Sequence, residues 1–104
     1  MLLPRGTVEA AELDKRVKGL APWPDGVVNL RYSVADDWSG DPAIFFWITL
    51  SDDAARREVL GQTSRRVRGF IEERLDPMGQ WGLLSYVSFR SESEQAMLKD
   101  KVFG

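Results

Sequence analysis

The clearest pattern in the chain is the strict alternation of side chains over residues 27–34. Its even positions are apolar and share one face of a strand: Val28, Leu30, Tyr32 and Val34. A period of two is typical of a half-buried strand. Residues 43–50 are apolar on both faces, as expected of a central strand. Because only a short polar loop separates the two segments, they predict an antiparallel hairpin.

Helical periodicity appears between and around the strand patterns. Over residues 51–75, one arc of a helix is apolar except for a single threonine: Val59, Leu60, Thr63, Val67, Phe70 and Ile71. The Ser-Asp-Asp sequence at 51–53 predicts the start of this long helix, and Asp76-Pro77 predicts its end. Residues 7–18 predict a thinner amphipathic helix, packed peripherally or reaching toward a partner.

The C-terminal part predicts one more strand and one more helix. The strand is expected over 81–90, with Trp81 as its first residue. Ser91 and Glu94 have the spacing of a capping box and predict a short helix to about Lys99.

These elements predict an α+β fold in the order α-β-β-α-β-α. We expect a three-stranded, mainly antiparallel sheet with one long helix packed across one face. The length of 104 residues suits a single domain, 1–104, with an N-terminal helix and proline-rich connector at 1–24 and a core at 25–104.

Alternation in the central strand predicts an exposed aromatic surface. If Ile44 and Phe46 face the long helix, Phe45 and Trp47 face the other way. Arg31 shares that second face, together with either Leu84 and Tyr86 or Leu83, Ser85 and Val87. Three coverings are open: the N-terminal segment, a second copy of the chain, or a ligand stacked on the rings. Our interface candidates are Phe45, Trp47, Arg31 and Tyr86.

Composition removes several classes of function. The chain has no Cys and no His, which excludes disulfides, thiolate nucleophiles, Cys-ligated metals and His-dependent catalytic triads. Four Trp in so short a chain are unusual. No apolar run is long enough for a signal peptide or a membrane-spanning helix, so we expect a cytoplasmic protein without membrane contact.

Two groups of charged residues are candidates for binding. Five arginines on the long helix could contact phosphates: Arg56, Arg57, Arg65, Arg66 and Arg68. Over 52–76 six basic and six acidic residues cancel, however, and the net charge of −2 argues against nucleic acid. Asp36, Asp37 and Asp41 could supply oxygen ligands to Ca²⁺ or Mg²⁺, although they are also ordinary turn residues.

The hairpin sequence also carries a resemblance. Asp37-Trp38-Ser39-Gly40-Asp41-Pro42-Ala43-Ile44-Phe45-Phe46, followed by a long helix and by Phe89-Arg90-Ser91-x-Ser93-Glu94-Gln95, resembles a group of small uncharacterised bacterial α+β proteins. The resemblance covers about residues 27–98, and it brings no activity with it.

Two other families are similar only in the order of elements. KH-like RNA binders such as ribosome-binding factor A share the order, but Gly79-Gln80-Trp81-Gly82 lacks the basic residue of the KH Gly-x-x-Gly clamp. Cytoplasmic domains of cation-efflux proteins share it and dimerise, but this chain has no His to hold a metal.

The sequence therefore predicts a small protein-interaction module without catalytic activity and without a cofactor. We expect a homodimer, or a complex with another protein, formed through the face of Phe45 and Trp47. The first alternative is a KH-like RNA- or ribosome-associated factor that uses the five arginines. The second is a metal-dependent enzyme that relies on carboxylates.

Overall fold

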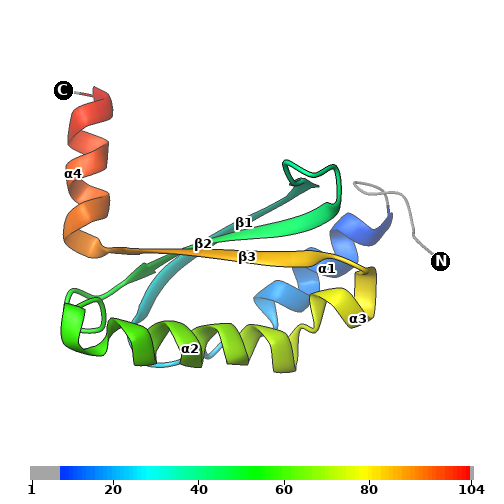
Figure 1. Cartoon of the computed structure of the whole chain (residues 1–104), viewed down its shortest axis with the longest axis horizontal. Helices are drawn as coiled ribbons and strands as arrows, with labels where there is room; N and C mark the ends of the chain where they lie inside the picture. Colours follow the sequence, from blue (N-terminus) through cyan, green and yellow to red (C-terminus); the bar gives the residue numbers. More distant parts are fainter. Residues whose placement is uncertain (1–7, 104) are drawn as a thin grey trace.

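The protein is a three-stranded mixed sheet with helices against one face (Figure 1). The computed structural model describes the backbone of residues 8–103 and the side chains of residues 11–98. The strands, in sheet order, are β1 (Val27–Asp36), β2 (Pro42–Leu50) and β3 (Leu84–Ser91). The helices are α1 (Val8–Lys18), α2 (Arg57–Arg74), α3 (Pro77–Trp81) and α4 (Glu92–Phe103).

Strand pairing follows the predicted hairpin and adds a parallel neighbour. β1 and β2 are antiparallel, with Arg31 opposite Trp47, whereas β2 and β3 are parallel, with Trp47 opposite Ser88. The parallel pairing arises because α2 carries the chain back to the end of the sheet where β2 began. The predicted α+β fold and its element order are confirmed, with α3 as an additional short helix before β3.

The hydrophobic core lies between the sheet and helices α1 and α2. From β2 it takes Ile44, Phe46, Ile48 and Leu50, each at most 2% exposed. The helices contribute Leu13, Val17, Val67 and Ile71 to the same cluster. Since side chains alternate along β2, this packing fixes Phe45 and Trp47 on the opposite face of the sheet.

Two local expectations from the sequence are wrong. Val28 was expected in the core but is 52% exposed, because the register of β1 shifts between Val27 and Asn29 and turns Val27 toward the core instead. Trp81 does not begin the third strand and is instead the last residue of α3. Asp76, at φ 50°, caps that helix by accepting the N–H of Gly79.

The long helix also begins later than its sequence suggests. Ser51 opens a separate turn, in which its hydroxyl accepts the N–H of Ala54 at 3.3 Å and its carbonyl accepts that of Ala55 at 3.0 Å. The helix itself starts only at Arg57, after the extended residue Arg56. Local side-chain bonding by the serine therefore competes with helix initiation at this point.

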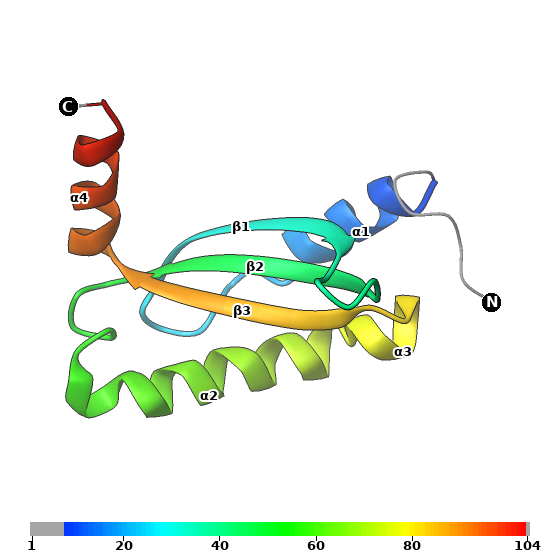
Figure 2. The ribbon, with the colours of Figure 1, turned by 45° about the horizontal axis from the view of Figure 1, so that its top comes forward.

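The terminal helix α4 stands away from the sheet on the side opposite α2 (Figures 1 and 2). Its start confirms the predicted capping box: Ser91 Oγ accepts the N–H of Glu94, and Glu94 Oε1 accepts the N–H of Ser91, both at 3.1 Å. Among the described residues, none of the helices has the length and apolar character needed to cross a bilayer.

Candidate functional site

The face of the sheet that points away from α1 and α2 is the most distinctive surface of the molecule. We call it the open face and define it by residues at alternating positions of the three strands: Asn29, Arg31, Ser33, Phe45, Trp47, Thr49, Tyr86, Ser88 and Arg90. The register places Phe45 between Ser33 and Tyr86, and Trp47 between Arg31 and Ser88. All four predicted interface candidates therefore lie together.

Four aromatic rings form a continuous ladder over this face. Trp38 lies 5.1 Å from Tyr86, Tyr86 lies 5.3 Å from Phe45, and Phe45 lies 6.2 Å from Trp47, measured between ring centroids. These are separations at which aromatic pairs attract one another. The guanidinium of Arg31 extends the ladder, 6.0 Å from the Trp47 ring. Because Trp47 is 41% exposed and Trp38 81% exposed, the ladder leaves a large apolar area in contact with water.

Asp37 positions the first ring of the ladder. Its Oδ1 accepts the N–H groups of Ser39 at 2.8 Å and Asp41 at 3.0 Å, and its Oδ2 accepts the hydroxyl of Tyr86 at 2.8 Å. Burial alone raises the pKa of Asp37, but the hydrogen bonds outweigh burial and hold that pKa below its usual value. The carboxylate thus ties the β1–β2 loop to β3 and holds Trp38 beside Tyr86.

Charges on the open face are separated along the strands. Arg90 lies at the end where β1 begins and β3 ends, since it pairs with Thr49, whereas Arg31 lies at mid-strand opposite Trp47. Asp41 lies at the other end of the face, immediately before β2. All three side chains are exposed. The face therefore has a basic end with Arg90, an aromatic centre with Arg31 and an acidic end with Asp41.

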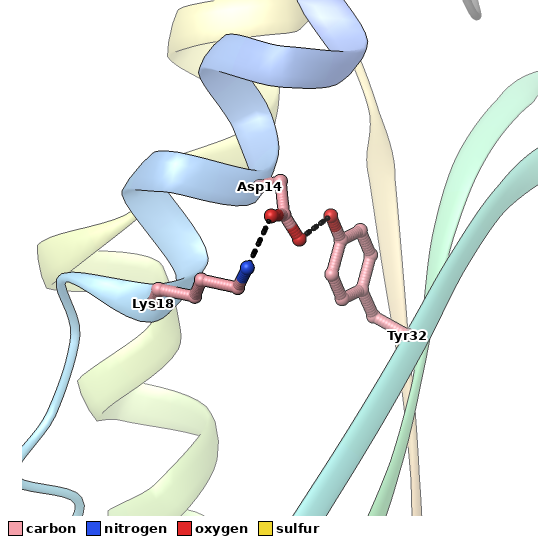
Figure 3. Close-up of polar contacts among 3 residues, drawn as sticks. All are labelled: Asp14, Lys18 and Tyr32. Atoms are coloured by element: carbon pink, nitrogen blue, oxygen red, sulfur yellow. Dashed lines mark hydrogen bonds and ion pairs between the residues drawn. The ribbon is translucent and has the colours of Figure 1, made fainter.

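The N-terminal helix does not cover this face. Leu13 and Val17 of α1 are buried in the core on the helical side of the sheet. The hydroxyl of Tyr32, which points to that same side, donates to Asp14 Oδ1 at 2.9 Å, and Lys18 pairs with the other oxygen at 2.8 Å (Figure 3). The connector follows α1, because Trp23 packs on Phe70 of α2 with centroids 5.1 Å apart. The expectation that the N-terminal segment covers the ladder is therefore wrong for both α1 and the connector.

The candidate arginines lie elsewhere, and acidic side chains lie among them. Arg57, Arg65, Arg66 and Arg68 are exposed on α2, and Arg56 immediately precedes it. At about 100° per residue, Arg57, Arg65 and Arg68 fall within an arc of about 80°, whereas Arg66 points away from it. Glu58 and Glu72 lie on the same side of the helix as those three arginines. Arg68 also lies over the ring of Phe89, with its guanidinium carbon 5.7 Å from the centroid. The arrangement gives α2 a face of mixed charge rather than a continuous phosphate-binding surface.

The acidic loop is occupied by structural hydrogen bonds. Both oxygens of Asp37 accept hydrogen bonds from the loop or from Tyr86, and its side chain is 8% exposed. Within the part of the chain that the structure describes, no three acidic side chains come together as a cation site. Asp41 instead contributes charge to one end of the open face.

Sequence reasoning missed two members of this site. Trp38 was not among the interface candidates, and Asp37 was considered only as a metal ligand or a turn residue. The Asp-x-Ser-Gly-Asp sequence was a signal for an Asp side chain that bonds its own loop. The bond from Tyr86 had no such signal, because it joins segments far apart in the chain.

Known proteins do not add to this picture: none of the family models, curated proteins or solved structures compared with the chain matches it. Function is therefore inferred from the geometry of the open face.

Proposed function

We propose that the protein is an interaction module that forms a homodimer through its open face. The observation that carries the proposal is the exposed aromatic ladder, whose central Trp47 is 41% exposed in the middle of a sheet. Contiguous apolar patches on folded proteins mark association sites, and their buried centres are rich in aromatic residues and arginine. The ladder with Arg31 matches that composition.

The charge pattern supports a second copy of the same chain as the partner. A two-fold axis parallel to the sheet and perpendicular to its strands stacks two open faces with their strands antiparallel. Asp41, at the acidic end of each copy, then approaches Arg90 at the basic end of the partner. A surface that complements its own rotated copy is what an isologous dimer requires.

The same observations support nucleic acid less well. Binding to a phosphate backbone needs clustered positive charge, whereas the two arginines of the open face lie on different outer strands and those of α2 are accompanied by acidic side chains. The RNA-binding and metal-dependent alternatives stay predictions, and no feature of the described residues favours either over self-association.

Light scattering after size exclusion tests the proposal. We expect wild type at about 100 µM to show twice the 11.8 kDa chain mass and Trp47→Glu to show the monomer mass, because the change buries two charges in the dimer. Met78→Glu is the matched control, since Met78 is 50% exposed on α3, away from the open face. Circular dichroism checks that both variants fold.

Two results would overturn the proposal. One is a monomeric wild type at high concentration. The other is a dimer whose mass is unaffected by Trp47→Glu, which places the interface elsewhere. If the wild type is a monomer that binds a single-stranded oligonucleotide and loses it with Trp47→Glu, the ladder is a base-stacking platform instead.

A further inference from the structure

The terminal helix α4 is anchored firmly at its base. Besides the Ser91–Glu94 capping box, Asp52 of the turn before α2 accepts hydrogen bonds from the N–H of Ser93 at 3.1 Å and from its hydroxyl at 2.7 Å. Both Asp52 contacts lie in the first turn of the helix. They fix the direction in which α4 leaves the sheet, on the side of the open face (Figures 1 and 2).

Beyond its anchored turn, α4 exposes apolar side chains. Met97 is 61% exposed and Leu98 is 36% exposed, so neither is buried against the sheet below. These residues belong to a helix that stands at the basic end of the open face, where β3 ends.

We propose that α4 is an arm with which each copy of the chain grips the other. In this arrangement Met97 and Leu98 pack against the β1–β2 loop of the second copy, next to its Trp38. The inference rests on the proposed function, because it needs the two open faces to be stacked with antiparallel strands. It adds a second contact region and fixes which ends of the copies meet.

The height of the exposed residues above the sheet fits this contact. Two stacked sheets lie about 10 Å apart. A helix rises about 1.5 Å per residue, so Met97 and Leu98, the sixth and seventh residues of α4, lie roughly 8–10 Å along it. The exposed apolar pair is therefore at the level at which the second sheet would lie.

A stable interface also needs a larger area than the open face of the sheet provides. Three strands spaced about 4.8 Å apart and eight residues long cover roughly 400 Å². A standard stable interface buries about 800 Å² on each partner. The open face alone supplies about half of that area, and two symmetric contacts between arm and loop supply further apolar area.

The proposed orientation explains the exposure of Trp38. When the strands of the two copies run antiparallel, the β1–β2 loop of one copy lies over the end of β3 of the other copy, where α4 begins. Trp38, at 81% exposure, is the ring of the ladder nearest that loop and the least covered. A methionine such as Met97 packs well against an aromatic ring of this kind.

Cysteine cross-linking tests the contact, and the absence of native Cys makes it specific. We would mix a Met97→Cys chain with a Ser39→Cys chain, oxidise them mildly, and measure the mixed disulfide dimer on a non-reducing gel. We expect the mixed dimer to dominate and Met97→Cys alone to cross-link poorly, because the two arms lie at opposite ends. Met78→Cys mixed with Ser39→Cys is the control and should give little product.

A second measurement does not depend on disulfide geometry. The double variant Met97→Glu/Leu98→Glu should raise the dimer dissociation constant by about tenfold or more, a cost of about 1.4 kcal/mol. Suppose that wild type is dimeric through Trp47 but neither the mixed disulfide nor the weakened affinity is found. The proposed contact of α4 is then wrong, whereas the proposed dimer through the open face is retained. Efficient self-cross-linking of Met97→Cys shows parallel strands and also overturns the arm contact.

Discussion

At the scale of single residues, Asp37 does the most to shape the candidate site. It accepts hydrogen bonds from two loop N–H groups and from Tyr86, and so joins the β1–β2 loop to β3 through one side chain. Replacing it would release Trp38 from the ladder as well as loosening the loop. A carboxylate that looked like a metal ligand thus has a mechanical role in the surface.

The lowered pKa of Asp37 predicts a specific loss of stability in acid. A carboxyl group whose pKa is lower in the folded state stabilises the fold above its unfolded pKa of about 3.9, and this stabilisation is lost as pH falls through the folded pKa. We expect the free energy of unfolding of wild type to fall more steeply below pH 4 than that of Asp37→Asn. Urea titrations at pH 2.5 to 7 measure the difference.

The control for this experiment is Asp53→Asn, which changes an exposed acid outside the loop. It should keep the acid dependence of wild type. If the free energy of unfolding depends on pH equally steeply in wild type and in Asp37→Asn, the hydrogen bonds to Asp37 contribute nothing to its titration.

At the scale of elements, α2 contains two glycines that the fold does not need. Nothing lies within 4 Å of a Cβ placed at Gly61 or Gly69, and both positions are helical and exposed. We expect Gly61→Ala and Gly69→Ala each to stabilise the protein by about 0.5–1 kcal/mol, measured by chemical denaturation. Gly26→Ala should destabilise it, because φ is +98° and the new Cβ meets Ala54 at 2.6 Å.

Elements with strong local signals could be predicted from the sequence. Alternation placed Phe45 and Trp47 on one face and Ile44 and Phe46 on the other, and the capping box at Ser91 marked the start of α4. These features depend on residues close together in the chain. The sequence therefore predicted the centre of the site and the elements that carry it.

Features that depend on distant contacts could not be predicted in the same way. The bulge that exposes Val28 arises from pairing with β2, and the parallel direction of β3 follows from the path of α2. Pro77 was interpreted only as the end of the long helix, although it also begins α3. Trp81 therefore lies in α3 and not in the strand. The packing side of α1 was left open because its apolar stripe fits either face of a sheet.

At the scale of the whole molecule, a dimer through the open face links stability to concentration. Because the partner binds only the folded chain, dilution favours unfolding. We expect the melting temperature of wild type to rise by a few degrees for each tenfold increase in protein concentration. That of Trp47→Glu should stay constant over the same range, and Met78→Glu should behave like wild type. A concentration-independent wild type would contradict the dimer.

The parallel pairing of β2 with β3 has a consequence for the order in which the surface is made. β1 and β2 are joined by a short loop, so their contacts close over short distances along the chain, whereas β3 can pair with β2 only after the whole of α2 and α3 has been traversed. Tyr86 links Trp38 to Phe45, so the ladder is continuous only once this last strand has docked. A chain still being synthesised lacks the completed surface until residue 86 has emerged, and the proposed face-to-face pairing would therefore wait until folding is nearly finished.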